Sequence, residues 1–214
     1  MDVRSFTVGP VAENCFIFRR DGSDRALIVD PGDEAPRILK AVDDLGLTVE
    51  AVLLTHCHFD HIGAVAPVAK ATGAPVYCPE IEVPVLADIM AFVPWPGFGP
   101  FESYEADETV AGGERLELAG LEIEVLFTPG HSPGHVTYAV REEAALFSGD
   151  VLFQGSVGRT DLPGGDWPTL LESIRSLVEG FPAETNVYPG HMGNTTLGAE
   201  RATNPFLAEL ATSD

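Results

Sequence analysis

The sequence contains few cysteines and no long run of apolar residues. Three cysteines are too few for a disulfide framework, and their odd number fits a reducing compartment. No segment is apolar over the length that a membrane span requires, and residues 1–5 lack the basic and apolar regions of a signal peptide. We therefore expect a soluble, cytoplasmic protein with no membrane partner.

Basic residues are also scarce: 12 Lys and Arg stand against 33 Asp and Glu, for a formal net charge of −21. A field of this sign repels nucleic acid, so no nucleic-acid partner is expected. An apolar fraction of 45% over 214 residues suffices for a full core. We expect residues 1–214 to form one domain.

The six histidines, by contrast, are concentrated. Three of them lie in Thr55-His56-Cys57-His58-Phe59-Asp60-His61, between an apolar run and a predicted helix start. Imidazole nitrogens and carboxylate oxygens are ligands of zinc and similar metals, so this density predicts a metal site. A single histidine at a strand end is usually only a satisfied polar residue. We expect Cys57 to be a packed thiol, because strand-like alternation turns it away from both neighbouring histidines.

Hydrophobic periodicity predicts the regular elements. Strands are expected at 4–8, 14–20, 25–29, 51–55, 75–78, 115–118, 121–127, 136–140, 144–148 and 186–188, and helices at 34–45, 62–73, 80–92, 166–179 and 197–210. The order of strands followed by a helix occurs twice, which predicts an α/β (α+β) protein with two packed sheets and helices outside. Residues 93–101 are too rich in Pro and Gly for a helix or strand. They form either a lid over the site or a hydrophobic loop in a core or subunit contact.

Further candidate ligands follow predicted strands. His131, Asp150 and His191 each come directly after a glycine at the end of such a strand. Loops that leave the same end of adjacent strands meet at one edge of a sheet, so we expect these side chains to join the segment 55–61. The preceding glycines allow close backbone approach or positive φ.

The segment 55–61, followed in order by Pro-Gly-His131, Ser-Gly-Asp150 and Pro-Gly-His191, resembles the metallo-β-lactamase superfamily. The chain is most similar to its glyoxalase II (hydroxyacylglutathione hydrolase) branch, and further matches lie at 29–32, 158–161 and 204–205. The resemblance implies a four-layer αββα sandwich of two mixed β-sheets flanked by helices. It also implies the short form of the family, because the sequence stops soon after its last candidate ligand, without the C-terminal helical domain that contacts glutathione.

The resemblance further implies two zinc ions, with iron or manganese as alternatives. One metal would be held by His56, His58 and His131 and the other by Asp60, His61 and His191, with Asp150 bridging them. A water shared by two cations would be ionised at neutral pH and would attack a carbonyl group. Asp60 is assigned a second, catalytic role, as acceptor of a proton when the tetrahedral intermediate collapses.

Four other residues near these motifs receive supporting roles. Asp30 is expected to hold the ligand loop through hydrogen bonds, to form a turn before Pro31-Gly32, or to do both. His135 is expected to be structural, and Arg159 and Asp161 to pin a loop.

The first functional hypothesis is hydrolysis of a thiolester, S-lactoylglutathione or a related small-molecule acyl thiol, at a dinuclear zinc site. The second is a persulfide dioxygenase with a single iron held by His56, His131 and Asp150, since two histidines and one carboxylate form the set used for oxygen chemistry. The third is a non-catalytic metal-binding protein on the same fold. β-Lactam hydrolysis is less expected, because His61 and Asp150 follow the hydrolase branch. The pattern assigns no oligomeric state.

Overall fold

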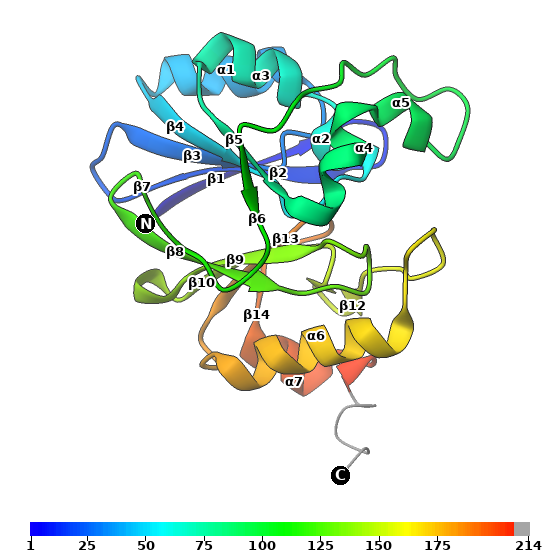
Figure 1. Ribbon diagram of the computed structural model, residues 1–214. Coiled ribbons are helices and arrows are strands. Elements are labelled where there is room, and N and C mark those ends of the chain that lie inside the picture. Colours follow the sequence, from blue (N-terminus) through cyan, green and yellow to red (C-terminus); the bar gives the residue numbers. More distant parts are fainter. Residues whose placement is uncertain (208–214) are drawn as a thin grey trace.

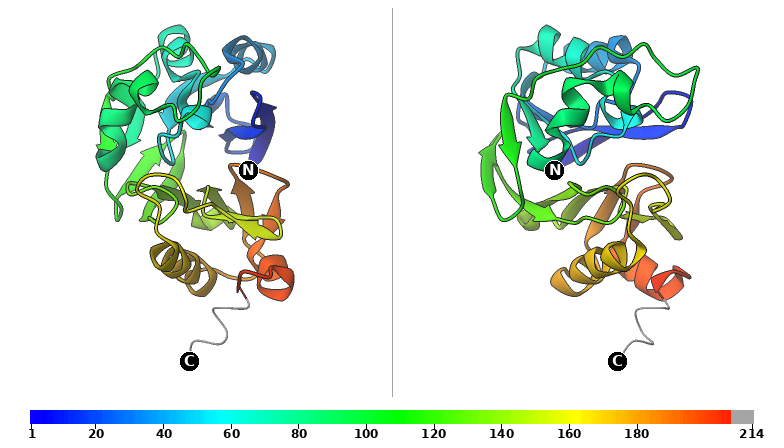
Figure 2. Two further views of the ribbon diagram at one scale, coloured as in Figure 1. Left: turned by 90° about the vertical axis from the view of Figure 1, so that its right-hand side faces the viewer. Right: turned by 45° about the vertical axis from the view of Figure 1, so that its right-hand side comes forward.

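Two β-sheets lie face to face between two layers of helices in the computed structural model, which describes residues 1–207 (Figure 1). Each of these sheets has six strands, and both are mixed. The turned views likewise show helices on the outer side of each sheet (Figure 2). The predicted four-layer αββα architecture is therefore confirmed.

The first sheet is built by the N-terminal half of the chain. Its strands, in spatial order, are β1 (Asp2–Val8), β2 (Glu13–Arg19), β3 (Arg25–Val29), β4 (Thr48–Leu53), β5 (Val76–Pro79) and β6 (Glu108–Val110). The first three form an antiparallel meander, with a turn at 20–24 between β2 and β3. From β3 to β6 the neighbouring strands are parallel. The connections through α1 (Ala35–Asp44), α3 (Val65–Thr72) and further helical turns return the chain to the end of the sheet at which the previous strand began.

The second sheet is built by the C-terminal half. Its spatial order is β14 (Thr195–Thr196), β13 (Asn186–Pro189), β10 (Ala145–Gly149), β9 (Val136–Val140), β8 (Leu121–Phe127) and β7 (Arg115–Leu118). Only the β10–β13 pair is parallel, since α6 (Trp167–Gly180) crosses between these strands. The outer face of the sheet packs against α6 and α7 (Leu197–Thr203). The strands β11 (Leu152–Phe153) and β12 (Ser156–Val157) form a separate hairpin, and η2 (Arg141–Glu143) links β9 to β10.

The core follows from side-chain alternation in the central strands. In β2, Cys15 and Ile17 face the helices, whereas Phe16 and Phe18 face the second sheet. A strand buried on both faces is a continuous apolar run, which is how this segment appears in the sequence. Between the sheets the Phe18 and Phe147 rings pack with their centroids 4.3 Å apart. The sheets are thus fixed relative to each other, and so are the loops at their edges.

The structure differs from the predicted elements in several places. The continuous helix expected at 80–92 is wrong: this stretch forms η1 (Glu80–Glu82), α4 (Val83–Ala87) and α5 (Ile89–Phe92). Pro84 is tolerated only in the first turn of α4, and Asp88 leaves helical geometry at φ −147° and ψ 66°. The strand expected at 51–55 begins earlier, because Thr48 and the next residue pair with β3. The short strands β6, β11, β12 and β14 were not predicted, and α7 ends at Thr203, with part of the helix expected at 197–210 lying outside the described residues.

Candidate metal centre

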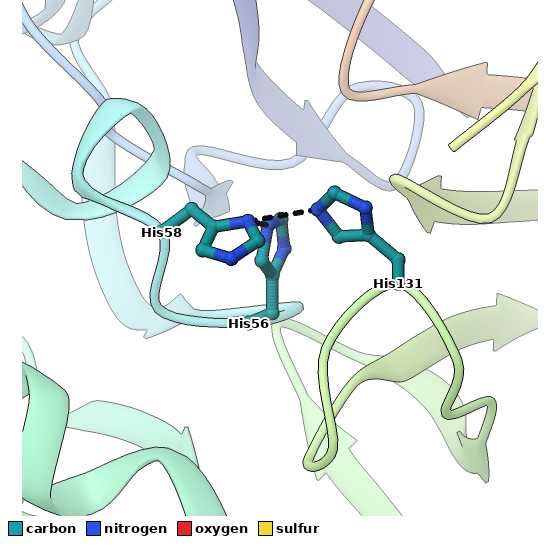
Figure 3. A group of neighbouring side chains, drawn as sticks. All are labelled: His56, His58 and His131. Carbon is teal, nitrogen blue, oxygen red and sulfur yellow. Dashed lines mark hydrogen bonds between the residues drawn. The ribbon is translucent and has the colours of Figure 1, made fainter. Parts of the chain in front are cut away.

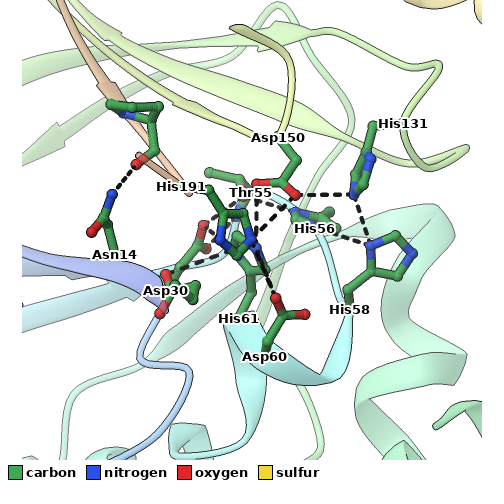
Figure 4. A network of polar contacts seen from close by, with 12 residues as sticks. Asn14, Asp30, Thr55, His56, His58, Asp60, His61, His131, Asp150 and His191 are labelled. Carbon is green, nitrogen blue, oxygen red and sulfur yellow. Dashed lines mark hydrogen bonds and ion pairs between the residues drawn. The ribbon is translucent and has the colours of Figure 1, made fainter. Parts of the chain in front are cut away.

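The histidine-rich segment connects β4 to a short helix, α2 (Phe59–Ile62). Asp30, at the end of β3, holds the start of this segment. Its Oδ1 accepts a hydrogen bond from the Thr55 amide at 2.8 Å, and its Oδ2 accepts one from the Thr55 hydroxyl at 2.6 Å. The same Oδ2 lies 3.0 Å from His61 Nδ1 (Figure 4). The expected support by Asp30 is confirmed. Its φ of +48° places it in the left-handed region where the chain leaves β3, and the turn before Pro31-Gly32 stays a prediction.

Three imidazole rings form the first candidate ligand group (Figure 3). His56 Nε2 lies 3.1 Å from His58 Nδ1, which lies 2.8 Å from His131 Nε2. Nitrogens bound to one tetrahedral zinc at about 2.0–2.1 Å stand about 3.4 Å from each other. The three rings are therefore already near the spacing that one metal ion requires.

The second group contains Asp60, His61 and His191, whose candidate ligand atoms lie within 4.8 Å of one another. The Asp60 Oδ2 atom is 3.3 Å from His191 Nε2 and 3.9 Å from His61 Nε2. Asp150 lies between the groups, with Oδ1 3.4 Å from His61 Nε2 and Oδ2 3.4 Å from His131 Nε2 (Figure 4). The structure thus brings together all seven candidate ligands: His56, His58, Asp60, His61, His131, Asp150 and His191.

Two atoms at the centre of this cluster lack hydrogen-bond partners. His61 Nε2 and Asp150 Oδ1 are buried, and although they lie close together neither makes a hydrogen bond among the described residues. Buried polar atoms nearly always have a partner, because losing water without replacement is costly. A cation would supply that partner to both atoms, so the residues present fit a metal ion.

The protonation states of His56, His58 and Asp150 suit metal binding. Burial, together with the neighbouring His61, holds the pKa of His56 well below its ordinary value, and burial beside His131 lowers the pKa of His58 to about 4. Burial alone would raise the pKa of Asp150, but the nearby His61 and His131 outweigh it and lower that pKa. Neutral imidazole and ionised carboxylate are the forms that bind metals.

Burial alone would lower the pKa of His61 and His191, but Asp60 and Asp150 outweigh it and raise both. These two rings must therefore lose a proton when a metal binds.

Backbone contacts orient several of these ligands. The Asp150 amide donates to His135 Nε2 at 3.0 Å, and the other ring nitrogen of His135 lies 3.0 Å from Thr128 Oγ1, so the expected structural role of His135 is confirmed. His131 Nδ1 donates to the Arg159 carbonyl at 2.8 Å, which directs Nε2 toward the cluster. The Arg159 guanidinium makes two hydrogen bonds to Asp161, as expected for residues that pin a loop.

Three supporting residues were not predicted. Asn14 Nδ2 donates to the carbonyls of Pro189 and Met192, and so holds the loop that carries His191. Glu82 Oε1 accepts from Ser132 Oγ at 2.7 Å and from the Gly134 amide at 2.8 Å, and so ties η1 to the loop that carries His131.

The third is Glu13, which is fully buried, with Oε1 3.7 Å from His61 Nδ1; burial raises its pKa well above the ordinary value. The only sequence signal for Glu13 and Asn14 is their position as polar residues within the apolar strand β2.

A cleft of about 1080 Å³ opens directly on the cluster. Residues 93–95 line it, whereas the rings of Phe98 and Phe101 pack against Phe59 with centroids 4.8 and 5.8 Å away. The packed hydrophobic loop is thus confirmed, residues 93–95 form part of the cleft wall, and a lid stays a prediction. Cys57 is buried with its Sγ 3.5 Å from that of Cys78, which confirms a packed thiol. Among residues 1–207, no helix is both long and apolar enough to cross a membrane.

The chain belongs to the metallo-beta-lactamase superfamily, whose family model matches residues 8–191. Among curated proteins it is 42% identical to the probable metallo-hydrolase YqgX of Bacillus subtilis, over 97% of this chain and 98% of that protein. It is 34% identical to the hydroxyacylglutathione hydrolase GloC of Haemophilus influenzae, over 97% of this chain and 98% of that protein.

Solved structures agree with the fold. BLEG-1, a B3 metallo-beta-lactamase, is 40% identical with a TM-score of 0.91, covering 96% of this chain and 99% of its own. TTHA1623 in a di-iron-bound form is 42% identical with a TM-score of 0.85, covering 95% of this chain and 100% of its own. ETHE1 from Myxococcus xanthus is 27% identical with a TM-score of 0.79, covering 96% of this chain and 84% of its own. The two ligand groups and the di-iron relative together support a dinuclear metal site.

Proposed function

We propose that the protein hydrolyses a thiolester, S-lactoylglutathione or a related acyl thiol, in the manner of the glyoxalase II branch. One observation carries the proposal. The Asp150 carboxylate reaches 3.4 Å from His61 Nε2 with one oxygen and 3.4 Å from His131 Nε2 with the other, and so stands between two complete ligand groups. Similarity to a hydroxyacylglutathione hydrolase over nearly the whole chain supports this choice among hydrolases.

The cofactor in this proposal is a pair of metal ions, zinc before iron or manganese. His56, His58 and His131 would hold the first, and Asp60, His61 and His191 the second, with Asp150 shared. Such a pair of cations would lower the pKa of a water molecule and polarise a substrate carbonyl. The protein therefore requires no serine or cysteine nucleophile.

The side chains of the site have their own tasks. Asp60 borders the cleft, and although burial alone would raise its pKa, His61 and His191 outweigh that effect and lower it. The ionised carboxylate is the form that binds a metal. We also assign Asp60 the role of accepting the proton released when the tetrahedral intermediate collapses. The departing thiolate is a stable anion, so no second acid is needed. Asp30, behind His61, orients that ring from the side away from the cleft.

Elemental analysis of protein purified without added metal, combined with a thiolester assay, tests the proposal. We expect about two metal ions per chain and turnover of S-lactoylglutathione or another acyl thiol. Asp150→Asn should lose metal and activity together, whereas Asp43→Asn, on the exposed face of α1, should keep both. One metal per chain, or no turnover across a panel of acyl thiols, would contradict the proposal.

A persulfide dioxygenase is the second candidate, favoured by the resemblance to ETHE1 and by the position of Asp150 beside His131. With His56 these residues form a set of two histidines and one carboxylate. Oxygen consumption by iron-loaded protein with glutathione persulfide would favour this reaction over hydrolysis. A β-lactamase is favoured only by the similarity to BLEG-1, and nitrocefin turnover tests it. A protein that binds metal but is silent in all three assays would be the non-catalytic alternative.

We further propose that the natural partners are small molecules in a reducing, cytoplasmic compartment, without nucleic acid or membrane. The negative charge of the chain and its three free cysteines support this expectation. Purification without bound nucleic acid at low salt would be the first check.

A further inference from the structure

The cleft above the candidate metal centre has an apolar rim. Four large apolar side chains line it while remaining 41–57% exposed: Ile81, Phe92, Trp95 and Met192. Most residues that line the cleft come from η1, α4, α5 and the loop after α5 and from loops of the C-terminal half. Figures 1 and 2 show that these two parts of the chain face each other. Exposed apolar side chains that line one concave surface indicate a binding site for an apolar group.

The walls of the cleft, outside the candidate metal centre, offer almost no positive charge. Among the described residues that line it, Arg159 is the only Lys or Arg, and its guanidinium is held by two hydrogen bonds of 2.6 and 2.7 Å to Asp161. Glu82, also in the cleft wall, already accepts hydrogen bonds from the Ser132 hydroxyl and the Gly134 amide. Glutathione carries two carboxylates, which proteins usually bind with Arg or Lys forks. The walls therefore do not match an anionic thiol carrier, and the net charge of −21 opposes one further.

We infer that the cleft receives an apolar acyl chain of several methylenes, and that the preferred substrate is an acyl thiol with such a chain on an uncharged carrier. This inference rests on the proposed thiolester hydrolysis and narrows its substrate. The thiolester carbonyl lies at the metal centre, where His131 and Asp150 border the cleft. The chain extends from there along the wall formed by Ile81 and Phe92.

A chain-length series tests the inference. The substrates are acetyl, butanoyl, hexanoyl and octanoyl thiolesters of N-acetylcysteamine, an uncharged thiol, and the same acyl groups on glutathione. Burial of one methylene is worth roughly a fourfold change in binding, so kcat/KM should rise at least tenfold from butanoyl to octanoyl. For each acyl group, kcat/KM should be no higher for the glutathione thiolester than for the N-acetylcysteamine thiolester. A flat series, or a preference for the glutathione esters, would overturn the inference while leaving thiolester hydrolysis intact.

Matched variants locate the effect. Phe92→Ser should reduce the octanoyl-to-acetyl ratio of kcat/KM at least tenfold. Phe127→Ser, with the same residue type and a similar exposure of 47% but outside the cleft, should preserve that ratio. Equal ratios in both variants would contradict a chain-binding role for this wall. Self-association that covers the cleft would give concentration-dependent rates without a chain-length effect, and would also overturn the inference.

A binding measurement makes the test independent of turnover. Trp95 and Trp167 are the only tryptophans, so Trp167→Phe leaves Trp95 as the sole tryptophan reporter in the cleft. In metal-free protein, the non-hydrolysable thioether S-octyl-N-acetylcysteamine should shift Trp95 emission to the blue. The dissociation constant from this titration should be at least tenfold lower than that of the S-ethyl compound. If no thiolester is hydrolysed, the proposed reaction fails but this shift still supports the cleft assignment. Equal binding of both compounds refutes it.

Discussion

Gly190, between β13 and His191, is the position where a single methyl group should most directly disturb the candidate metal centre. A Cβ at this position would lie 2.6 Å from His61 Cε1 and closer still to Asp150 Oδ1. The backbone of Gly190 is outside the left-handed region, so an alanine meets no φ penalty there. The effect of Gly190→Ala must therefore come from the side chains that the methyl group displaces.

The expected magnitude follows from that overlap. Non-bonded carbon atoms normally stay about 3.5–4.0 Å apart, so His61 or the 190–191 backbone must move by about 1 Å. Overpacking of this kind costs ~1–3 kcal/mol of unfolding free energy. A displacement of about 1 Å at a reacting centre lowers turnover on the order of 100-fold. We expect Gly190→Ala to show both losses, together with reduced metal content.

Gly180→Ala is the matched control. Gly180 ends α6, and a Cβ there would meet no atom within 4 Å. Alanine should raise stability by up to ~1 kcal/mol through helix propensity and leave metal content and kcat/KM unchanged. Urea denaturation, elemental analysis and the thiolester assay, run in parallel, check both variants. Full metal content and normal kcat/KM in Gly190→Ala would refute the close packing of His61, Asp150 and the 190–191 backbone.

Three further outcomes are expected. Burial raises the pKa of Glu13 in the folded protein above its unfolded value. The contribution of Glu13 to stability is therefore fully present below the unfolded pKa and is lost as pH rises through the folded pKa. Urea denaturation of metal-free protein should show that Glu13→Gln is more stabilising at about pH 8 than at about pH 5. Asn14→Ala leaves two carbonyls of the His191 loop without their hydrogen-bond donor. The free energy of unfolding, measured by the same urea denaturation, should fall by ~1–3 kcal/mol. An unchanged free energy of unfolding would show that these hydrogen bonds are replaceable. Asp161→Asn weakens the hydrogen bonds that hold the Arg159 guanidinium and so frees its charge for the carboxylates of glutathione. KM for glutathione thiolesters should fall about two- to fivefold. An unchanged KM would count against the inference that the cleft walls lack a cation for an anionic carrier.

Metal removal provides one more check within the same set of measurements. A ligand that binds only the folded state stabilises it, so chelation should abolish thiolester turnover and lower the thermal midpoint, and readdition of zinc should restore both. A thermal midpoint insensitive to chelation would contradict metal binding by the buried cluster.

Much of the candidate site was predictable from short-range patterns. The spacing of the segment 55–61 and the Gly-His131, Gly-Asp150 and Gly-His191 pairs place candidate ligands directly after strands, and strand order then directs them to one edge. The order of strands followed by a helix, which occurs twice along the chain, likewise predicts two packed sheets with helices outside. These features depend on local periodicity and turn chemistry, which neighbouring residues encode.

The rest was decided by tertiary packing. Asn14 holds the carbonyl of Pro189, which is 175 positions away, and Glu82 holds the loop of Ser132 across the two halves of the chain. No local pattern contains such a pair, because its partners become neighbours only after both sheets have packed. The apolar cleft has the same origin, since its walls come from α5 and from loops of the other half. The sequence by itself determined which residues can bind metal, and only the folded structure determined what orients them and what borders them.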